Sequence, residues 1–166
     1  MGCGKTTIGK YLSTKTHLKQ IDTDFEIEKL EHISIDEIFS KYKERYFRKV
    51  ETKVLERTTK KSCCIISTGG GIFLKRKNRK ICKKNGIIIF LSCPIEICLN
   101  RIKNKKSRPL LINNKRKIVT MFKKRQKIYR NVADLIIENN ETPEKCTDLI
   151  LKFLKLSSPR FEKHCN

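Results

Sequence analysis

The segment Gly2-Cys3-Gly4-Lys5-Thr6-Thr7 at the start of the chain constrains the fold more than any other feature. It matches the second half of the pattern G-x-x-x-x-G-K-[ST], in which inward-pointing backbone N–H groups hold phosphate oxygens. The lysine of this pattern adds positive charge, the hydroxyl after it ligates Mg²⁺, and small residues let the backbone approach closely. Residues 6–12 are typical of a helix whose N-terminus points at the same anion. The segment therefore predicts a phosphate-binding loop.

The hydrophobic strand that normally leads into such a loop is absent from the sequence, as is the first glycine of the pattern. We therefore expect that the first strand of the fold is missing from this chain. Met1 would then be an internal methionine of the loop, and the functional protein would begin about ten residues upstream. By itself, the loop pattern is also compatible with a glycine-rich turn before a surface helix.

The chain is strongly basic: lysine and arginine total 39, against 17 aspartates and glutamates in 166 residues, which gives a net charge of +22. Such a charge attracts nucleic acid, nucleotides and acidic metabolites alike. The lysines are scattered over nearly every expected helix and are not interleaved with aromatic residues that stack on bases. We interpret most of them as solvated surface residues and predict no specific nucleic-acid partner.

The eight cysteines form no C-x-x-C pair and have no histidine at a zinc-finger spacing. Most of them lie in apolar stretches, as small hydrophobic residues do in a reducing compartment. The longest apolar run, 86–91, has the length of a buried strand and is too short for a membrane span. We find no signal-peptide pattern and predict a soluble cytoplasmic monomer without a membrane partner.

Short β-branched runs alternate with helical stretches, which predicts an α/β fold of three layers with a parallel sheet flanked by helices. Strands are expected at 19–24, 63–67, 87–91 and 133–138. Ser34-Ile35-Asp36-Glu37 is a capping box that opens a helix, and Thr142-Pro143 begins the last one. The segment 103–117 lacks helical periodicity and is expected to be a mobile loop. Residues 1–156 would form one domain, followed by a polar tail at 157–166.

Six segments together resemble the ordered signatures of shikimate kinases, in the family's order and at close to its spacing. They are Gly4-Lys5-Thr6-Thr7, Ile21-Asp22-Thr23-Asp24, Phe47-Arg48, Thr68-Gly69-Gly70-Gly71, Ser107-Arg108-Pro109-Leu110-Leu111, and Arg125 before Ile128-Tyr129-Arg130. The resemblance covers about residues 2–150. It implies a nucleoside-monophosphate-kinase-like P-loop fold and the ATP-dependent phosphorylation of the 3-hydroxyl of shikimate, on the pathway to chorismate and aromatic amino acids.

The resemblance also implies which residues bind the nucleotide. The implied ATP site consists of Gly2, Cys3, Gly4, Lys5, Thr6, Thr7, Arg101 and Arg108. Lys5 would bridge the β- and γ-phosphates, and Arg108, in a lid at about 103–117, would close over them, so that both act as catalytic residues. Arg101 would stack on the adenine. Thr6 would ligate Mg²⁺, the implied cofactor, and Asp22 would hold the same ion through water.

The implied shikimate site lies on the helices at about 25–61 and on the residues that face them. Asp24 would contact the attacking hydroxyl and accept its proton, and alternation along an extended strand would put it on the same side as Asp22. Arg48 and Arg125 would grip the carboxylate of shikimate, since a planar guanidinium can donate two parallel hydrogen bonds. The substrate pocket would be lined by Gly69, Gly70 and Gly71.

Three other interpretations remain open from the sequence. A gluconate or nucleotide kinase of the same fold would share the phosphate loop, but it would have no reason to combine Asp24, Arg48, a triple glycine and Arg125. A basic nucleic-acid-binding module with relic kinase motifs would retain nucleic acid with a steep salt dependence. A degenerate chain without activity would follow from the missing strand.

We predict that the chain as printed is poorly stable and weakly active or inactive. A missing strand of about five apolar residues removes roughly 1.5–3 kcal/mol of burial per side chain, against a typical total stability of about 5–15 kcal/mol. Adding a short apolar strand and a glycine at the first position of the loop should therefore raise both the melting temperature and the rate of shikimate phosphorylation. Equal melting and equal rates for the two proteins would refute this expectation.

Overall fold

The computed structural model describes residues 2–61, 63–103 and 115–157. The strands are β1 (Lys19–Asp22), β2 (Cys64–Ser67), β3 (Ile89–Ser92) and β4 (Leu135–Glu138). The helices are α1 (Lys5–Thr16), α2 (Thr23–Glu31), α3 (Ile35–Thr58), α4 (Arg76–Asn85), α5 (Ile95–Lys103), α6 (Lys115–Val132), α7 (Pro143–Ser157) and the short 3₁₀ helix η1 (Ile72–Leu74). No helix in this part of the chain is long and apolar enough to cross a bilayer.

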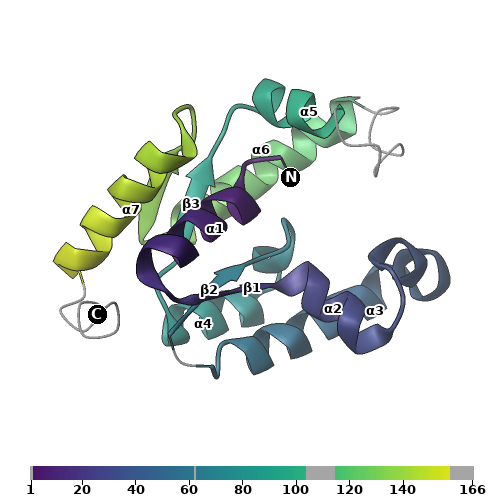
Figure 1. Ribbon diagram of the computed structural model, residues 1–166. Coiled ribbons are helices and arrows are strands. Elements are labelled where there is room, and N and C mark those ends of the chain that lie inside the picture. Colours follow the sequence, from purple (N-terminus) through teal and green to yellow (C-terminus); the bar gives the residue numbers. More distant parts are fainter. Residues whose placement is uncertain (1, 62, 104–114, 158–166) are drawn as a thin grey trace.

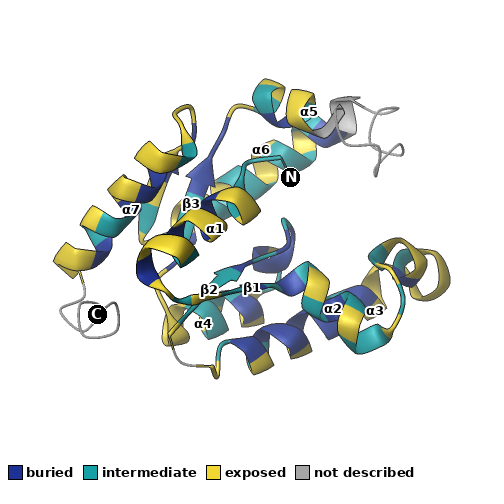
Figure 2. Ribbon diagram, viewed as in Figure 1, coloured by how far each residue is buried: buried dark blue, intermediate teal, exposed yellow. Residues whose placement is uncertain are grey.

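The predicted parallel α/β architecture is confirmed, because β1 pairs with β2 and β3 with β4, each in parallel register. Helices α1 and α7 cover one face, where Ile8 and Leu12 of α1 share a buried cluster with Leu91 of β3. Leu55 of α3 and Val132 of α6 form another cluster with η1. Figure 1 shows α1 running across the strands, and Figure 2 shows that the exposed residues of α7 lie on its outer side.

The four strands of the described chain form two separate two-stranded sheets. Between the sheets lies a cavity of about 570 Å³, lined by the whole of β2, by the first three residues of β3 and by apolar residues of α1. The edges of β2 and β3 on this side have no strand partner among the described residues. Unpaired backbone groups and unfilled apolar space both lower stability. Among the described residues, the region between the two strand pairs is therefore a weakly packed part of the core.

The strands expected at 63–67, 87–91 and 133–138 differ from β2, β3 and β4 by one or two residues at their ends, and other segments differ more or lie outside the described residues. The strand expected at 19–24 ends at Asp22, because this side chain caps α2 and the chain turns into a helix. Helix α6 begins at Lys115, so the segment 103–117 is helical at both ends. The centre of the expected lid, 104–114 with Arg108, lies outside the described residues, as does 158–166 of the expected tail.

Helices α2 and α3 pack on each other around a cluster that includes Ile27, Ile38 and Phe47. The predicted capping box is confirmed, since the Ser34 hydroxyl accepts a hydrogen bond from the Glu37 amide and the Glu37 carboxylate accepts one from the Ser34 amide. This cap fixes the point at which the chain turns from α2 into α3.

Helix α3 is broken at Lys43, whose backbone adopts φ 65° and ψ 175°. This region is populated almost only by glycine and costs other residues about 1–3 kcal/mol. The break divides α3 into a first part that carries Ile38 and a second part that begins at Glu44 and carries Phe47. A strained residue therefore sets the direction in which the second part starts.

We predict that Lys43→Gly stabilises the protein, because glycine adopts this conformation without a Cβ clash. The relief of strain is partly offset by the greater freedom of glycine in the unfolded chain, which leaves a net gain of about 1 kcal/mol. A calorimetric melting temperature should rise by about 2–4 °C. The control is Lys41→Gly, at an exposed helical position before the break, which should lower it. A melting temperature of Lys43→Gly at or below that of the parent chain would contradict the assignment of strain.

Candidate active site

The predicted phosphate-binding loop lies at the N-terminus of α1, as expected. Gly2 and Gly4 have φ values of 67° and 80°, which side chains rarely allow. A Cβ at Gly2 would lie 2.5 Å from the Cys98 carbonyl oxygen, and a Cβ at Gly4 would lie 2.8 Å from Asn139 Nδ2. Both positions therefore require glycine. The loop leaves the free N–H groups of the helix start available for an anion.

Residues from distant parts of the chain hold this loop in place. Asn139, directly after β4, donates from Nδ2 to the Cys3 carbonyl at 2.6 Å. Gln20 of β1 donates from Nε2 to the Thr6 carbonyl at 3.2 Å and to Ser67 Oγ at 3.0 Å. Each of the two sheets thus contributes one amide side chain to the loop. Neither side chain was expected from the sequence, because no local pattern marks an amide that acts over such a separation.

Lys5 and Arg101 bring two cations to the loop. Lys5 Nζ lies 3.5 Å from Cys3 Sγ. Burial would raise the pKa of Cys3. The positive charge of Lys5 and its hydrogen bond to the thiol act in the opposite direction, and the pKa of Cys3 is lowered overall. Arg101 is exposed on α5, and its guanidinium donates to the Gly2 carbonyl at 3.4 Å. The structure therefore places Arg101 beside the loop.

Thr6 and Asp22 supply oxygen ligands of the kind that Mg²⁺ prefers. Thr6 Oγ1 lies 3.4 Å from Asp22 Oδ2. The other carboxylate oxygen of Asp22 accepts a hydrogen bond from the Asp24 amide at 3.0 Å. No group of three or more His, Cys, Asp or Glu side chains suited to a metal occurs among the described residues. Mg²⁺ needs only one or two protein ligands when it also binds substrate phosphates, so this pair fits the ion.

Asp24 lies in the first turn of α2, so the expectation that it follows Asp22 along an extended strand is wrong. The carboxylate of Asp24 nevertheless lies at the glycine-rich turn after β2. A Cβ at Gly69 would lie 2.6 Å from Asp24 Oδ1, and the Gly69 amide donates to Thr23 Oγ1 at 3.1 Å. The start of α2 therefore places the Asp24 carboxylate beside Gly69.

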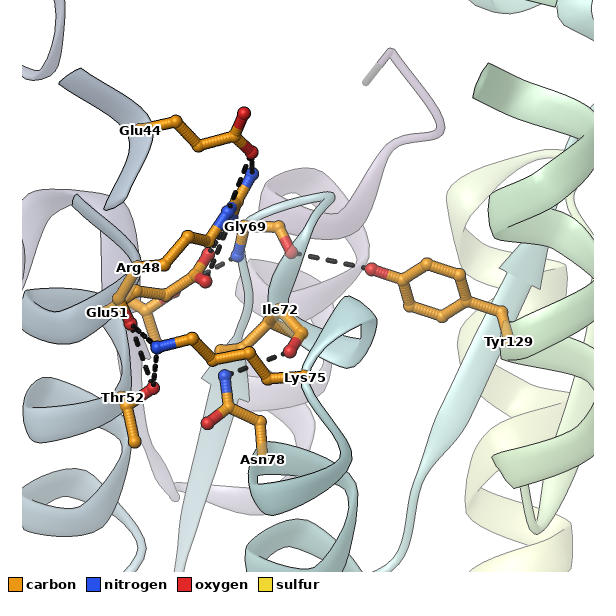
Figure 3. A network of polar contacts seen from close by, with 10 residues as sticks. Glu44, Arg48, Glu51, Thr52, Gly69, Ile72, Lys75, Asn78 and Tyr129 are labelled. Atoms are coloured by element: carbon orange, nitrogen blue, oxygen red, sulfur yellow. Dashed lines mark hydrogen bonds and ion pairs between the residues drawn. The ribbon is translucent and has the colours of Figure 1, made fainter. Parts of the chain in front are cut away.

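Arg48 lies on the other side of the same turn, where its guanidinium fills the space that a Cβ on Gly71 would need. Its NH1 group donates to both oxygens of Glu51 at 2.8 and 2.9 Å, and Glu51 is only 1% exposed. Nε and NH2 donate to Glu44 at 3.2 and 3.1 Å. Lys75 Nζ donates to the Arg48 carbonyl at 2.7 Å. Figure 3 shows Glu44 and Glu51 on either side of the guanidinium.

The charge of Arg48 is secured by these carboxylates. Burial would lower the pKa of Arg48, but the hydrogen bonds and charges of Glu51 and Glu44 outweigh it and raise that pKa. Glu51 and Glu44 lie three and four residues from Arg48, which is the spacing of neighbours on one helical face. This spacing is visible in the sequence and could have identified both partners.

Arg125 reaches the site from α6. Its Nε is buried and has no hydrogen-bond partner among the described residues. Burial is the main cause that lowers the pKa of Arg125, and the nearby positive charge of Arg48 lowers it further. Tyr129, one turn further along α6, donates to the Gly69 carbonyl at 3.5 Å and packs on Phe73. A partly buried guanidinium whose Nε has no partner in the described chain, near the positive charge of a second arginine, is suited to an anionic ligand.

A phosphate-binding loop on α1, oxygen ligands beside it and a second, basic pocket at the ends of neighbouring strands define a P-loop kinase. The family model for shikimate kinase matches residues 1–155. The chain is 42% identical over 153 residues to the shikimate kinase of Caldicellulosiruptor bescii. The aligned region covers 91% of this chain and 89% of that protein. The chain belongs to the shikimate kinase family.

Solved structures agree with this assignment. The shikimate kinase of Acinetobacter baumannii in complex with shikimate has a TM-score of 0.84 and 38% sequence identity, covering 94% of this chain and 87% of that one. The Aquifex aeolicus shikimate kinase has a TM-score of 0.84 and 37% identity, covering 93% and 92%. The predicted P-loop kinase fold is therefore confirmed.

Proposed function

We propose that this chain transfers the γ-phosphoryl group of ATP to the 3-hydroxyl of shikimate. The observation that carries the proposal is that Asp24 and Arg48 flank the turn at Gly69–Gly71, with Arg125 of α6 within electrostatic reach of Arg48. In this arrangement Arg48 and Arg125 can bind one carboxylate of the substrate, and Asp24 can accept the proton of one substrate hydroxyl. The 38% identical Acinetobacter baumannii kinase, whose structure contains shikimate, supports the proposal.

On the nucleotide side, the N–H groups of the loop and Lys5 would bind the phosphates, and Arg101, which donates to the Gly2 carbonyl, would stack on the adenine. Thr6 and Asp22 would hold Mg²⁺, which supplies positive charge to the β- and γ-phosphates when it is bound. Arg108 would add a cation from the lid, at a position outside the described residues. Most of the catalysis then comes from positioning and charge, as phosphoryl transfer requires.

On the acceptor side, Arg48 and Arg125 orient shikimate through its carboxylate, and the turn at Gly69–Gly71 lines the pocket. The 3-hydroxyl oxygen attacks the γ-phosphorus as the bond to the β–γ bridging oxygen breaks. Asp24 accepts the hydroxyl proton as the new bond forms. The bridging oxygen leaves with the electron pair on ADP, where Lys5 offsets its charge.

We further propose that the protein acts as a monomer in the cytoplasm and has no specific nucleic-acid partner. The seven cysteines within the described residues are free thiols, which fits a reducing compartment. The exposed lysines fit a solvated surface, as the sequence led us to expect.

A coupled assay for ADP release tests the proposed reaction against the other kinases of this fold. We expect release that depends on shikimate, with kcat/KM for gluconate and nucleoside monophosphates at least about a hundredfold lower. A nucleoside monophosphate has no carboxylate, and the open chain of gluconate does not hold its carboxylate and hydroxyl groups in one fixed geometry. A preference for gluconate or a nucleotide would contradict the proposal. Steeply salt-dependent retention of nucleic acid without turnover would favour the nucleic-acid-binding alternative.

We predict that Asp24→Asn lowers kcat by a factor of about a hundred or more, the usual scale for a lost proton acceptor. ATP binding, measured by titration calorimetry, should change little. Asp36→Asn, an exposed carboxylate in the first turn of α3, is the control and should leave kcat near that of the parent chain. If Asp24→Asn kept more than about half of the parent kcat, Asp24 would have no part in the mechanism.

Substitution of Arg125 should raise the KM for shikimate far more than the KM for ATP. Removing one partner of a charge pair buried against a ligand costs on the order of 2–5 kcal/mol. Arg125→Lys should rescue only part of the loss in Arg125→Ala, because the fork geometry is absent. Arg130→Lys, an exposed position on the same helix, is the control.

Arg48→Ala should raise the KM for shikimate by the same amount as Arg125→Ala. Equal effects on both substrates would refute the carboxylate assignment.

A further inference from the structure

Arg48 has two carboxylate partners within the protein itself. Glu51 accepts hydrogen bonds from NH1 with both of its oxygens, and one oxygen of Glu44 accepts from Nε and NH2 together. The Nε and NH2 edge is one of the two edges that can donate a parallel pair of bonds to a carboxylate. The other edge, formed by NH1 and NH2, lies so close to Gly71 that this residue has no room for a Cβ. Glu44 therefore occupies a position that a bound carboxylate would need.

Of the two partners, Glu44 is the one that can move away. Its side chain is 64% exposed, whereas that of Glu51 is 1% exposed. Displacing Glu51 would leave a buried carboxylate without its cation, which is strongly unfavourable. Displacing Glu44 returns its carboxylate to water and breaks an exposed ion pair, and such pairs contribute little to stability. A ligand that approaches Arg48 should therefore replace Glu44 and leave Glu51 in place (Figure 3).

Glu44 also acts on the second arginine. Burial lowers the pKa of Arg125, and the negative charge of Glu44 opposes that change. Glu44 thus lies within electrostatic reach of both cations that the proposed function assigns to the substrate carboxylate. It is the first residue after the strained backbone of Lys43, which sets where the second part of α3 begins. The position of its carboxylate therefore follows from the fold.

We propose that Glu44 is an internal competitor for the substrate carboxylate and a determinant of specificity. It pairs with Arg48 and has to swing toward solvent before both arginines can grip a carboxylate. Small anions gain too little from the two arginines to displace it, whereas a ligand that also uses Asp24 and the glycine turn gains enough. The inference rests on the proposed function for the identity of the natural ligand.

The test compares Glu44→Gln and Glu44→Ala with the parent chain by titration calorimetry. Both variants should bind shikimate about two- to fivefold more tightly, the range expected for release of one exposed ion pair. They should also bind benzoate, a carboxylate without hydroxyl groups, more tightly by a similar factor. The affinity for ATP should stay the same.

Glu56→Gln is the matched control, since Glu56 lies on the same helix and pairs with Lys77 at 2.7 Å, away from Arg48. It should change none of these affinities. Unchanged or weaker binding of both carboxylates in the two Glu44 variants, with melting temperatures near that of the parent chain, would overturn the proposal and make Glu44 a residue that positions Arg48. Benzoate binding tests the inference even if the chain does not phosphorylate shikimate, and phosphorylation without tighter binding refutes the inference alone.

Discussion

The ion pair between Arg48 and Glu51 is the interaction on which the acceptor side of the site depends. A carboxylate that is 1% exposed has to keep its cation, so Arg48 is fixed on α3 at one orientation. The guanidinium in turn fills the space beside Gly71. Lys75 adds a bond from the segment after η1 to the Arg48 carbonyl. The pocket therefore has a rigid wall with one movable carboxylate, Glu44.

The two halves of the site depend on the two sheets to different extents. The glycine turn with Asp24 follows the β1–β2 pair, whereas the phosphate loop is held both by Gln20 of β1 and by Asn139, which follows β4. Helix α1 packs on both sheets, and the cavity of about 570 Å³ lies between them. The distance between a bound nucleotide and the acceptor pocket thus depends on packing that is incomplete in this region. Stability and alignment for phosphoryl transfer are physically linked here.

Local patterns predicted the parts of the molecule that short-range physics decides. The phosphate loop, the capping box at Ser34 and Glu37, the proline at the start of α7 and the alternation of strands and helices all depend on neighbours within a few residues. The strand expected to extend to Asp24 ended early, because an aspartate side chain at Asp22 can cap a helix as readily as it can end a strand. The extent of the lid stays a prediction.

The sequence by itself determined the fold class, the kinase family and the residue types of the candidate site, because these are written in contiguous motifs and their order. Only the tertiary structure decided which groups compete or cooperate. It showed that Arg48 is shared by two carboxylates of unequal burial, that Nε of Arg125 has no partner in the described chain and that Asn139 holds the phosphate loop. Burial and contacts between distant segments set these properties, and neither is encoded at any single position.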